Sequence, residues 1–130
     1  MIYGIGTDII DINRIKSVLN KYGDKFKYKC FHQNEISLSN SKLKSAQSFA
    51  KRYAAKEACA KALGTGLAKG VFWKDIEIKN NVSGKPFILL HNKAYLRGMN
   101  ISNKNLQIDV SLSDERNYAI ANVVIFNNEK

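Results

Sequence analysis

The segment that most constrains this chain is Ser48–Gly66, SFAKRYAAKEACAKALGTG, where alanine occupies positions 50, 54, 55, 58, 60 and 62. Alanine is the strongest helix former, and Gly64 and Gly66 supply a natural end to a helix. Small side chains all around the helix allow other elements to pack closely against it from several directions. The sequence therefore predicts a central, alanine-packed helix.

Four charged residues are set into this predicted helix: Arg52, Lys56, Glu57 and Lys61. Glu57 and Lys61 lie one turn apart on one face, and Arg52 and Lys56 lie one turn apart on another. The ordinary interpretation is two surface ion pairs, each worth a few tenths of a kcal/mol. A charge on a central helix needs a partner, however, and one carboxylate cannot balance three cations. We therefore expect an anionic ligand against this helix.

The length and charge of the chain limit its class. At 130 residues it is expected to form one domain over 1–130. Its net charge is +10, and residues 1–70 hold 13 Lys and Arg against 5 Asp and Glu. This excess predicts an anionic partner, with nucleic acid, an anionic membrane surface, a phosphorylated cofactor and an acidic protein all open at this level.

Three absences from the sequence bear on its location. The two cysteines, Cys30 and Cys59, lack the spacing of a zinc site and do not neighbour a histidine in sequence. The chain shows no leader pattern and no apolar run long enough for a membrane span. We expect a reduced, soluble, cytoplasmic protein.

The order of predicted elements indicates an α+β fold, an antiparallel sheet with a long C-terminal hairpin around the central helix. The hydrophobic patterns predict, in order, a strand over Ile2–Ile10, helices over Asp11–Tyr22, Asp24–Phe31 and Gln33–Leu38, a polar linker over Ser37–Ser48, the central helix, a hairpin of Val71–Asn80 with Phe87–Leu90, a helix over Asn92–Met99, and a hairpin of Leu106–Leu112 with Tyr118–Phe126. A hydrophobic hairpin this long also favours coverage by another subunit.

Two carboxylates from different predicted elements indicate a metal-binding site. Asp8 stands between apolar residues, and because Asp11 is already placed to cap the next helix, a functional role for Asp8 is favoured. Asp8 and Glu57 together suit Mg²⁺, which takes one or two carboxylates and completes its shell with water and phosphate oxygens. Lys61 would then contact the same phosphate, and Arg52 with Lys56 a further one. This describes a site for a compound with more than one phosphate group.

These residues also match a known family. Gly6-x-Asp8 and Tyr53-x-x-Lys56-Glu57-Ala58-x-x-Lys61 resemble the two motifs of the 4′-phosphopantetheinyl transferases. The resemblance is closer to the short bacterial type, the holo-[acyl-carrier-protein] synthases. The opening MIYGIGTDII, the Gly84-Lys85-Pro86 turn and the closing SLSDERNYAIANVVI fit in the same order, so the resemblance covers nearly the whole chain.

The resemblance implies an enzyme that transfers the phosphopantetheine arm of coenzyme A to a serine of apo acyl carrier protein, a step of fatty acid biosynthesis that releases adenosine 3′,5′-bisphosphate. It implies Mg²⁺ held by Asp8 and Glu57, with Lys61 on the pyrophosphate. It also implies a homotrimer with active sites between subunits. The partners that it implies are coenzyme A and an acidic carrier protein, and neither nucleic acid nor a membrane is among them.

Further positions follow from the same resemblance. The turns Gly64-Thr65-Gly66 and Lys85-Pro86 fall where family members approach coenzyme A, and Arg14 matches the arginine that meets the acidic carrier protein. Two positions depart from the family pattern. Asp114 stands where some members have histidine, so we assign it no catalytic role, and Tyr53 replaces a tryptophan or phenylalanine.

Two other classes remain as alternatives. A small RNA- or DNA-binding protein would use the basic first half, but it gives no reason for Asp8 and Glu57, which would repel phosphates unless a metal bridged them. A Mg²⁺-dependent nucleotide hydrolase shares the carboxylate pair and lacks a recognisable base. For the transferase, the acceptor of the serine proton is open among Glu57, Asp8 and a metal-bound water.

Overall fold

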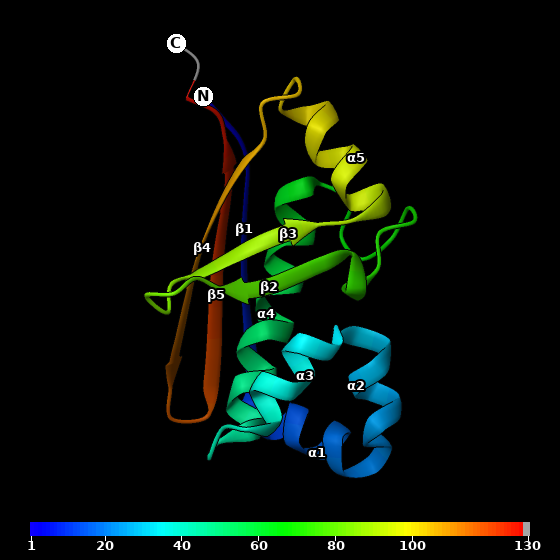
Figure 1. Cartoon of the computed structure of the whole chain (residues 1–130), viewed down its shortest axis with the longest axis vertical. Coiled ribbons are helices and arrows are strands. Elements are labelled where there is room, and N and C mark those ends of the chain that lie inside the picture. Colours follow the sequence, from blue (N-terminus) through cyan, green and yellow to red (C-terminus); the bar gives the residue numbers. More distant parts are fainter. Residues whose placement is uncertain (129–130) are drawn as a thin grey trace.

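The computed structural model describes residues 1–128, which fold into helices and strands around one alanine-rich helix (Figure 1). In chain order the elements are β1 (Ile2–Asp11), α1 (Ile12–Tyr22), α2 (Asp24–Cys30), α3 (Gln33–Asn40), α4 (Ser45–Leu63), the 3₁₀ turn η1 (Trp73–Asp75), β2 (Ile76–Asn80), β3 (Pro86–Leu90), α5 (Asn92–Ile101), β4 (Gln107–Glu115) and β5 (Tyr118–Phe126). The predicted α+β fold with an antiparallel sheet is confirmed.

The three longest strands form one antiparallel sheet in the order β1-β5-β4. The predicted C-terminal hairpin is its centre and one edge, and the pairing of Glu115 with Tyr118 closes the turn. Strand β1 adds on the other side of β5, where Asp8 pairs with Ala121. The two-stranded sheet β2-β3 crosses in front of this sheet, with α4 between them, and α1, α2 and α3 gather around one end of α4 (Figure 1).

Two glycines of β1 allow the strand to lie directly on α4. A Cβ atom at Gly4 would come 2.0 Å from the carbonyl oxygen of Ala62, and one at Gly6 would come 1.8 Å from that of Ala58. Only glycine permits so close an approach between two backbones. The small residues of β1 and α4 therefore place the inward face of the strand against the helix, as the alanine pattern predicted.

Two segments differ from the sequence-based expectation. The predicted linker Ser37–Ser48 is mostly helical, because α3 continues to Asn40 and α4 begins at Ser45. The buried hydroxyls of Ser39 and Ser48 lie 2.9 Å apart, so these polar residues are satisfied inside helix contacts. The strand predicted from Val71 begins only at Ile76, because the Asp75 carboxylate accepts a hydrogen bond from the Phe72 amide and stabilises a 3₁₀ turn.

Three isoleucines of β1 are exposed at the surface. Ile2, Ile5 and Ile9 lie on β1 with 61%, 68% and 59% of their surfaces exposed, so this edge strand carries exposed apolar side chains. Cys30 and Cys59 are buried and unpaired, and burial raises the pKa of the Cys59 thiol to about 12.

Among the described residues, no helix combines the length and apolar character needed to cross a bilayer.

Candidate active site

Asp8 and Lys61 bring the first strand and the central helix together. The Lys61 Nζ lies 3.1 Å from Oδ1 of Asp8, and it also donates to the carbonyl oxygen of Thr7. The Asp8 side chain is only 14% exposed, whereas that of Lys61 is 51% exposed. Side chains alternate along a strand, so Asp8 shares the α4-facing side of β1 with Gly4 and Gly6.

Glu57 lies one turn before Lys61 on the same face of α4 and is partly buried. Helical side chains tilt toward the N-terminus of their helix, which directs Glu57 toward the level of Asp8. The pKa of Tyr53 is raised to about 12, first by burial and then by the charge of Glu57 and a hydrogen bond to it. The positive charge of Arg14 acts on the same hydroxyl, so α1 lies beside this face of the helix.

The donor set at this face suits a hard cation. Asp8 and Glu57 offer carboxylate oxygens, the ligand type of Mg²⁺, from two elements whose backbones are in direct contact. The cation now facing Asp8 is the exposed Lys61 amine, which is long and flexible enough to share the carboxylate with a metal ion. The donor chemistry of the two residues is compatible with the predicted metal.

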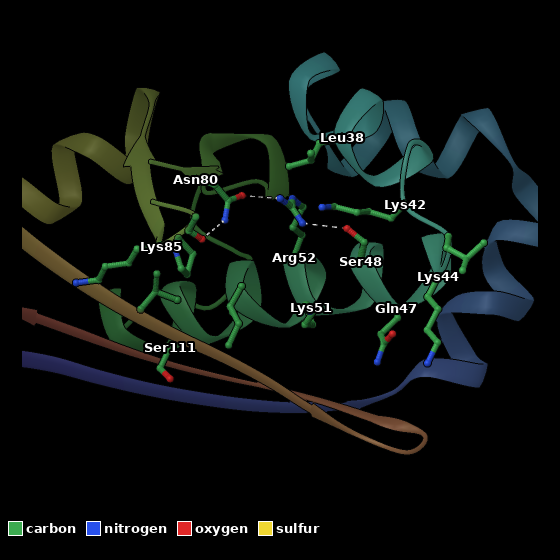
Figure 2. A pocket seen from close by; sticks show the side chains of 15 residues that line it. Leu38, Lys42, Lys44, Gln47, Ser48, Lys51, Arg52, Asn80, Lys85 and Ser111 are labelled. Atoms are coloured by element: carbon green, nitrogen blue, oxygen red, sulfur yellow. Dashed lines mark hydrogen bonds between the residues drawn. The ribbon is translucent and has the colours of Figure 1, made fainter. Parts of the chain in front are cut away.

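A basic pocket lies on another side of α4. It encloses about 760 Å³ between the α3–α4 connection, the start of α4, the β2–β3 turn and β4. Its cations are Lys42, Lys44, Lys51, Arg52 and Lys85. Figure 2 shows the Arg52 guanidinium hydrogen bonded to Ser48 and Asn80, with Lys42 extending toward it. Pro86 also lines the pocket, so Arg52, Lys85 and Pro86 meet in one place.

Arg52 is the buried charge of this pocket. It is 6% exposed, and its two hydrogen-bond acceptors are the neutral side chains of Ser48 and Asn80, at 3.0 and 2.8 Å. Among the described residues no carboxylate lies within ion-pair distance of it, and its Nε has no hydrogen-bond partner. Burial lowers the pKa of Arg52. A buried cation with only neutral partners is a ready binding group for an anion.

The prediction that Lys56 contacts the ligand is wrong. Its side chain is fully buried, and Nζ lies 2.9 Å from Oε1 of Glu35 and also donates to the carbonyl oxygens of Trp73 and Ile76. Burial lowers the pKa of Lys56, and Glu35 opposes that shift. All three protons of the ammonium are used inside the core, so Lys56 is structural.

The Gly64-Thr65-Gly66 turn ends α4 at the end opposite the basic pocket. Gly64 caps the helix at a φ of 79°, and the Gly66 amide donates to the carbonyl of Ala60. The Arg97 Nε donates to the carbonyl of Leu63 at 2.8 Å, which adds a cation that the sequence patterns did not single out. The turn is therefore on the Lys61 side of the molecule, about three helical turns from Arg52.

Asp114 has a structural role in this chain. Its carboxylate accepts a hydrogen bond from Gln47 and lies 3.1 Å from the Lys51 Nζ, so it ties β4 to the first turns of α4. Lys51 is itself a cation of the basic pocket. Asp114 thus orients the wall of that pocket.

Two groups of predicted residues therefore open on different sides of α4. Asp8, Glu57 and Lys61 form one group, and Arg52 with Lys85 and Pro86 forms the other. Arg52 and Lys61 are nine residues apart, which places them on roughly opposite sides of a helix with 3.6 residues per turn. Lys42, Lys44 and Lys51 are far from Lys85 in the sequence, and only the folded chain brings them to the same pocket.

The chain matches known proteins over nearly its full length. Residues 4–123 match the model of the 4′-phosphopantetheinyl transferase superfamily. A holo-[acyl-carrier-protein] synthase of Wolbachia pipientis is 48% identical over 128 residues, covering 96% of this chain and 98% of the relative.

Two solved structures have the same fold. The holo-[acyl-carrier-protein] synthase of Neisseria meningitidis has a TM-score of 0.84 and 35% identity over 100% of both chains. The enzyme of Helicobacter pylori in complex with coenzyme A has a TM-score of 0.79 and 34% identity, covering 93% of this chain and 98% of that one. The chain therefore belongs to the 4′-phosphopantetheinyl transferase superfamily, among the holo-[acyl-carrier-protein] synthases.

Proposed function

We propose that this chain transfers 4′-phosphopantetheine from coenzyme A to a serine of apo acyl carrier protein with Mg²⁺, releases adenosine 3′,5′-bisphosphate and serves fatty acid biosynthesis. The observation that carries the proposal is the contact between Asp8 of β1 and Lys61 of α4, beside Glu57. It gives an anionic group on β1 and a cationic group on α4 within reach of one phosphate.

Asp8 and Glu57 are the residues that would hold Mg²⁺. When bound, the ion would neutralise charge on the diphosphate and help to orient it. Lys61 supplies a protein cation at the same place, where it stabilises the charge that develops as the bond between the two phosphates breaks. The serine hydroxyl gives its proton to a carboxylate or water at this site, its oxygen forms the new bond to the phosphate that carries pantetheine, the bond between the two phosphates breaks, and adenosine 3′,5′-bisphosphate leaves.

The basic pocket supplies the second half of the proposed coenzyme A site. Arg52 offers a charged donor to a further phosphate of coenzyme A, and Lys42 extends into the same space. Lys85, whose Nζ lies 3.5 Å from Oδ1 of Asp109, would turn from that carboxylate to the phosphate. Because this pocket and the Asp8 group face different sides of α4, one coenzyme A molecule would contact both groups most directly if they came from two subunits. The exposed isoleucines of β1 supply an apolar face for such an assembly, which we propose is a homotrimer.

The carrier protein is proposed to dock beside α1. Arg14 is exposed on that helix, and its charge reaches the Tyr53 hydroxyl next to Glu57. An acidic carrier held there would present its serine close to the carboxylate pair. Complementary charge of this kind accelerates association more than it tightens the complex.

The test is a mass measurement of apo acyl carrier protein incubated with coenzyme A, Mg²⁺ and enzyme. We expect a gain of about 340 Da on the carrier, the mass of the transferred group in this phosphoryl transfer. Asp8→Asn and Glu57→Gln should abolish the gain while the far-ultraviolet circular dichroism spectrum stays unchanged. Asp11→Asn is the matched control, because Asp11 caps α1 through the Asn13 amide and asparagine also caps helices. Full activity of an Asp8→Asn, Glu57→Gln double variant would contradict the proposal.

A further inference from the structure

Two histidines and a glutamate meet where the α2–α3 connection contacts the β2–β3 sheet. One ring nitrogen of His32, one of His91 and one carboxylate oxygen of Glu77 all lie within 4.8 Å of one another. The two rings are 5.1 Å apart between centroids, and the His91 Nε2 lies 2.9 Å from Oε1 of Glu77. The three residues come from three separate elements.

The backbone of each of these residues is fixed. The His32 amide donates to Oε1 of the buried Glu35, and the His91 amide donates to the carbonyl of Asp75. Glu77 sits inside β2, paired with Leu89. The donor groups are therefore held by secondary structure and by the core, which is the condition for a preorganised metal site.

The chemistry of the cluster matches zinc. Two imidazoles and one carboxylate form a known three-residue set for Zn²⁺, with a fourth position left to water. In tetrahedral coordination with bonds of about 2.0–2.2 Å, ligand atoms stand roughly 3.3–3.6 Å apart, so small side-chain rotations suffice here. The His91 side chain is 39% exposed and that of Glu77 is 8% exposed, which leaves the cluster open on one side.

Two further contacts favour a cation. The His32 Nε2 lies 2.6 Å from the carbonyl oxygen of Lys74, the kind of outer contact that orients a metal-binding imidazole. Among the described residues, His91 is the only side chain hydrogen bonded to the Glu77 carboxylate, and the buried Lys56 ammonium also acts on that carboxylate through its charge. A mostly buried carboxylate is stabilised by positive charge, and a bound divalent ion would add to it.

We propose that His32, Glu77 and His91 bind a zinc-type divalent ion, separate from the Mg²⁺ site proposed at Asp8 and Glu57. The ion fastens the α2–α3 connection to the β2–β3 sheet. The sequence did not point to it, because His32 and His91 are 59 positions apart and show no motif spacing. This proposal does not depend on the transferase activity.

The experiment uses the full chain without a histidine tag. The chain contains two histidines in total, and both belong to the cluster. Zn²⁺ is titrated by calorimetry in a buffer without phosphate or chelator, and Co²⁺ absorption reports the geometry of the site. We expect one Zn²⁺ per chain, an intense visible Co²⁺ band typical of tetrahedral coordination, and a higher melting temperature on adding Zn²⁺.

Variants assign the ion to the cluster. His32→Gln and His91→Gln should each weaken Zn²⁺ binding by at least about tenfold, the loss seen even for outer-contact residues of metal sites. Asp8→Asn with Glu57→Gln should leave Zn²⁺ binding unchanged, because those carboxylates lie elsewhere. Proton NMR of the two histidine rings in the unmutated chain gives a measurement that needs no variant, since both sets of ring signals should shift together at one equivalent. Absence of one-to-one binding, or binding by both histidine variants as tight as that of the unmutated chain, would overturn the proposal.

Discussion

The Nζ of Lys56 lies 2.9 Å from Oε1 of Glu35, and both side chains are buried in the core. Oε1 of Glu35 also accepts from the His32 amide, so one carboxylate joins α4 to the start of α3. A buried charge that loses its partner is costly, whereas replacing the pair is much less so. Lys56 therefore belongs to the stability of the fold and not to the binding of coenzyme A.

We predict that Lys56→Met lowers the free energy of unfolding by about 3–5 kcal/mol, because it leaves the Glu35 carboxylate buried without a counter-charge. Urea denaturation followed by circular dichroism measures the change. Adding Glu35→Gln to the same chain should recover part of the loss. Lys25→Met, an exposed lysine on α2, is the control and should change little. A loss under about 1 kcal/mol for Lys56→Met would contradict the assignment.

Lys56 illustrates which features of the fold could be predicted from the sequence and which could not. The alanine run, its glycine stop and the glycines of β1 specify local conformation and close packing, so α4 and its contact with β1 were predictable. Helical spacing placed Lys56 beside Arg52, but spacing does not say which of two neighbouring cations finds a carboxylate elsewhere. The carboxylate that pairs with Lys56 belongs to Glu35, 21 residues earlier, and the two meet only in the folded chain.

The candidate site residues also separate into those that are noticeable in the sequence and those that only the tertiary structure brings together. Asp8 and Lys61 could be singled out in the sequence, because a carboxylate inside an otherwise apolar strand and a lysine on a small-residue helix are both locally unusual; their contact is seen only in the folded chain. The basic pocket was not, since its cations come from segments between positions 42 and 85 that only tertiary structure assembles. The two histidines near Glu77 were missed for the same reason.

Arg52 should matter for one phosphate of coenzyme A. We predict that Arg52→Met raises the KM for coenzyme A by roughly 10- to 100-fold, the loss of a charged hydrogen bond worth about 1.5–3 kcal/mol. With 3′-dephospho-coenzyme A as substrate the same change should have a much smaller effect, if the pocket holds the 3′-phosphate. Steady-state kinetics with both substrates measures the difference. Equal losses for the two substrates would show that Arg52 acts only on the fold.

Gly6 sets the distance between Asp8 and α4. We predict that Gly6→Ala lowers the free energy of unfolding by about 3 kcal/mol or more, because the added Cβ would overlap the carbonyl oxygen of Ala58. Gly84→Ala is the matched control. Nothing lies within 4 Å of its Cβ, so only its φ of +91° carries a cost, about 1 kcal/mol. Chemical denaturation of both variants decides whether the close approach is required, and similar losses would argue against it.

The proposed assembly through the outer face of the sheet makes a prediction about subunits. Ile5→Lys places a charge on the apolar surface formed with Ile9, and we expect it to convert the trimer to a monomer. Sedimentation velocity at several concentrations measures this change. Thr7→Lys, on the same exposed side of β1 between the two isoleucines, tests whether the whole face is covered. Retention of the assembly by Ile5→Lys would place the interface elsewhere.

Mixing two variants, each damaged in one half of the site, tests whether each site is shared between subunits, provided that coenzyme A is kept far below the raised KM of Arg52→Met. Asp8→Asn chains keep an intact basic pocket, and Arg52→Met chains keep an intact carboxylate pair. If one coenzyme A site combines the pocket of one subunit with the carboxylates of its neighbour, random mixed trimers regain activity at about a quarter of their sites. The matched control mixes Asp8→Asn with Glu57→Gln, which damage the same half of the site and should restore nothing. Mild denaturation dissociates the trimers, and reassembly then exchanges subunits between the two variants. Mass spectrometry of the intact trimers confirms the exchange. If verified mixed trimers of the first pair stay as inactive as the control, the site lies within one chain.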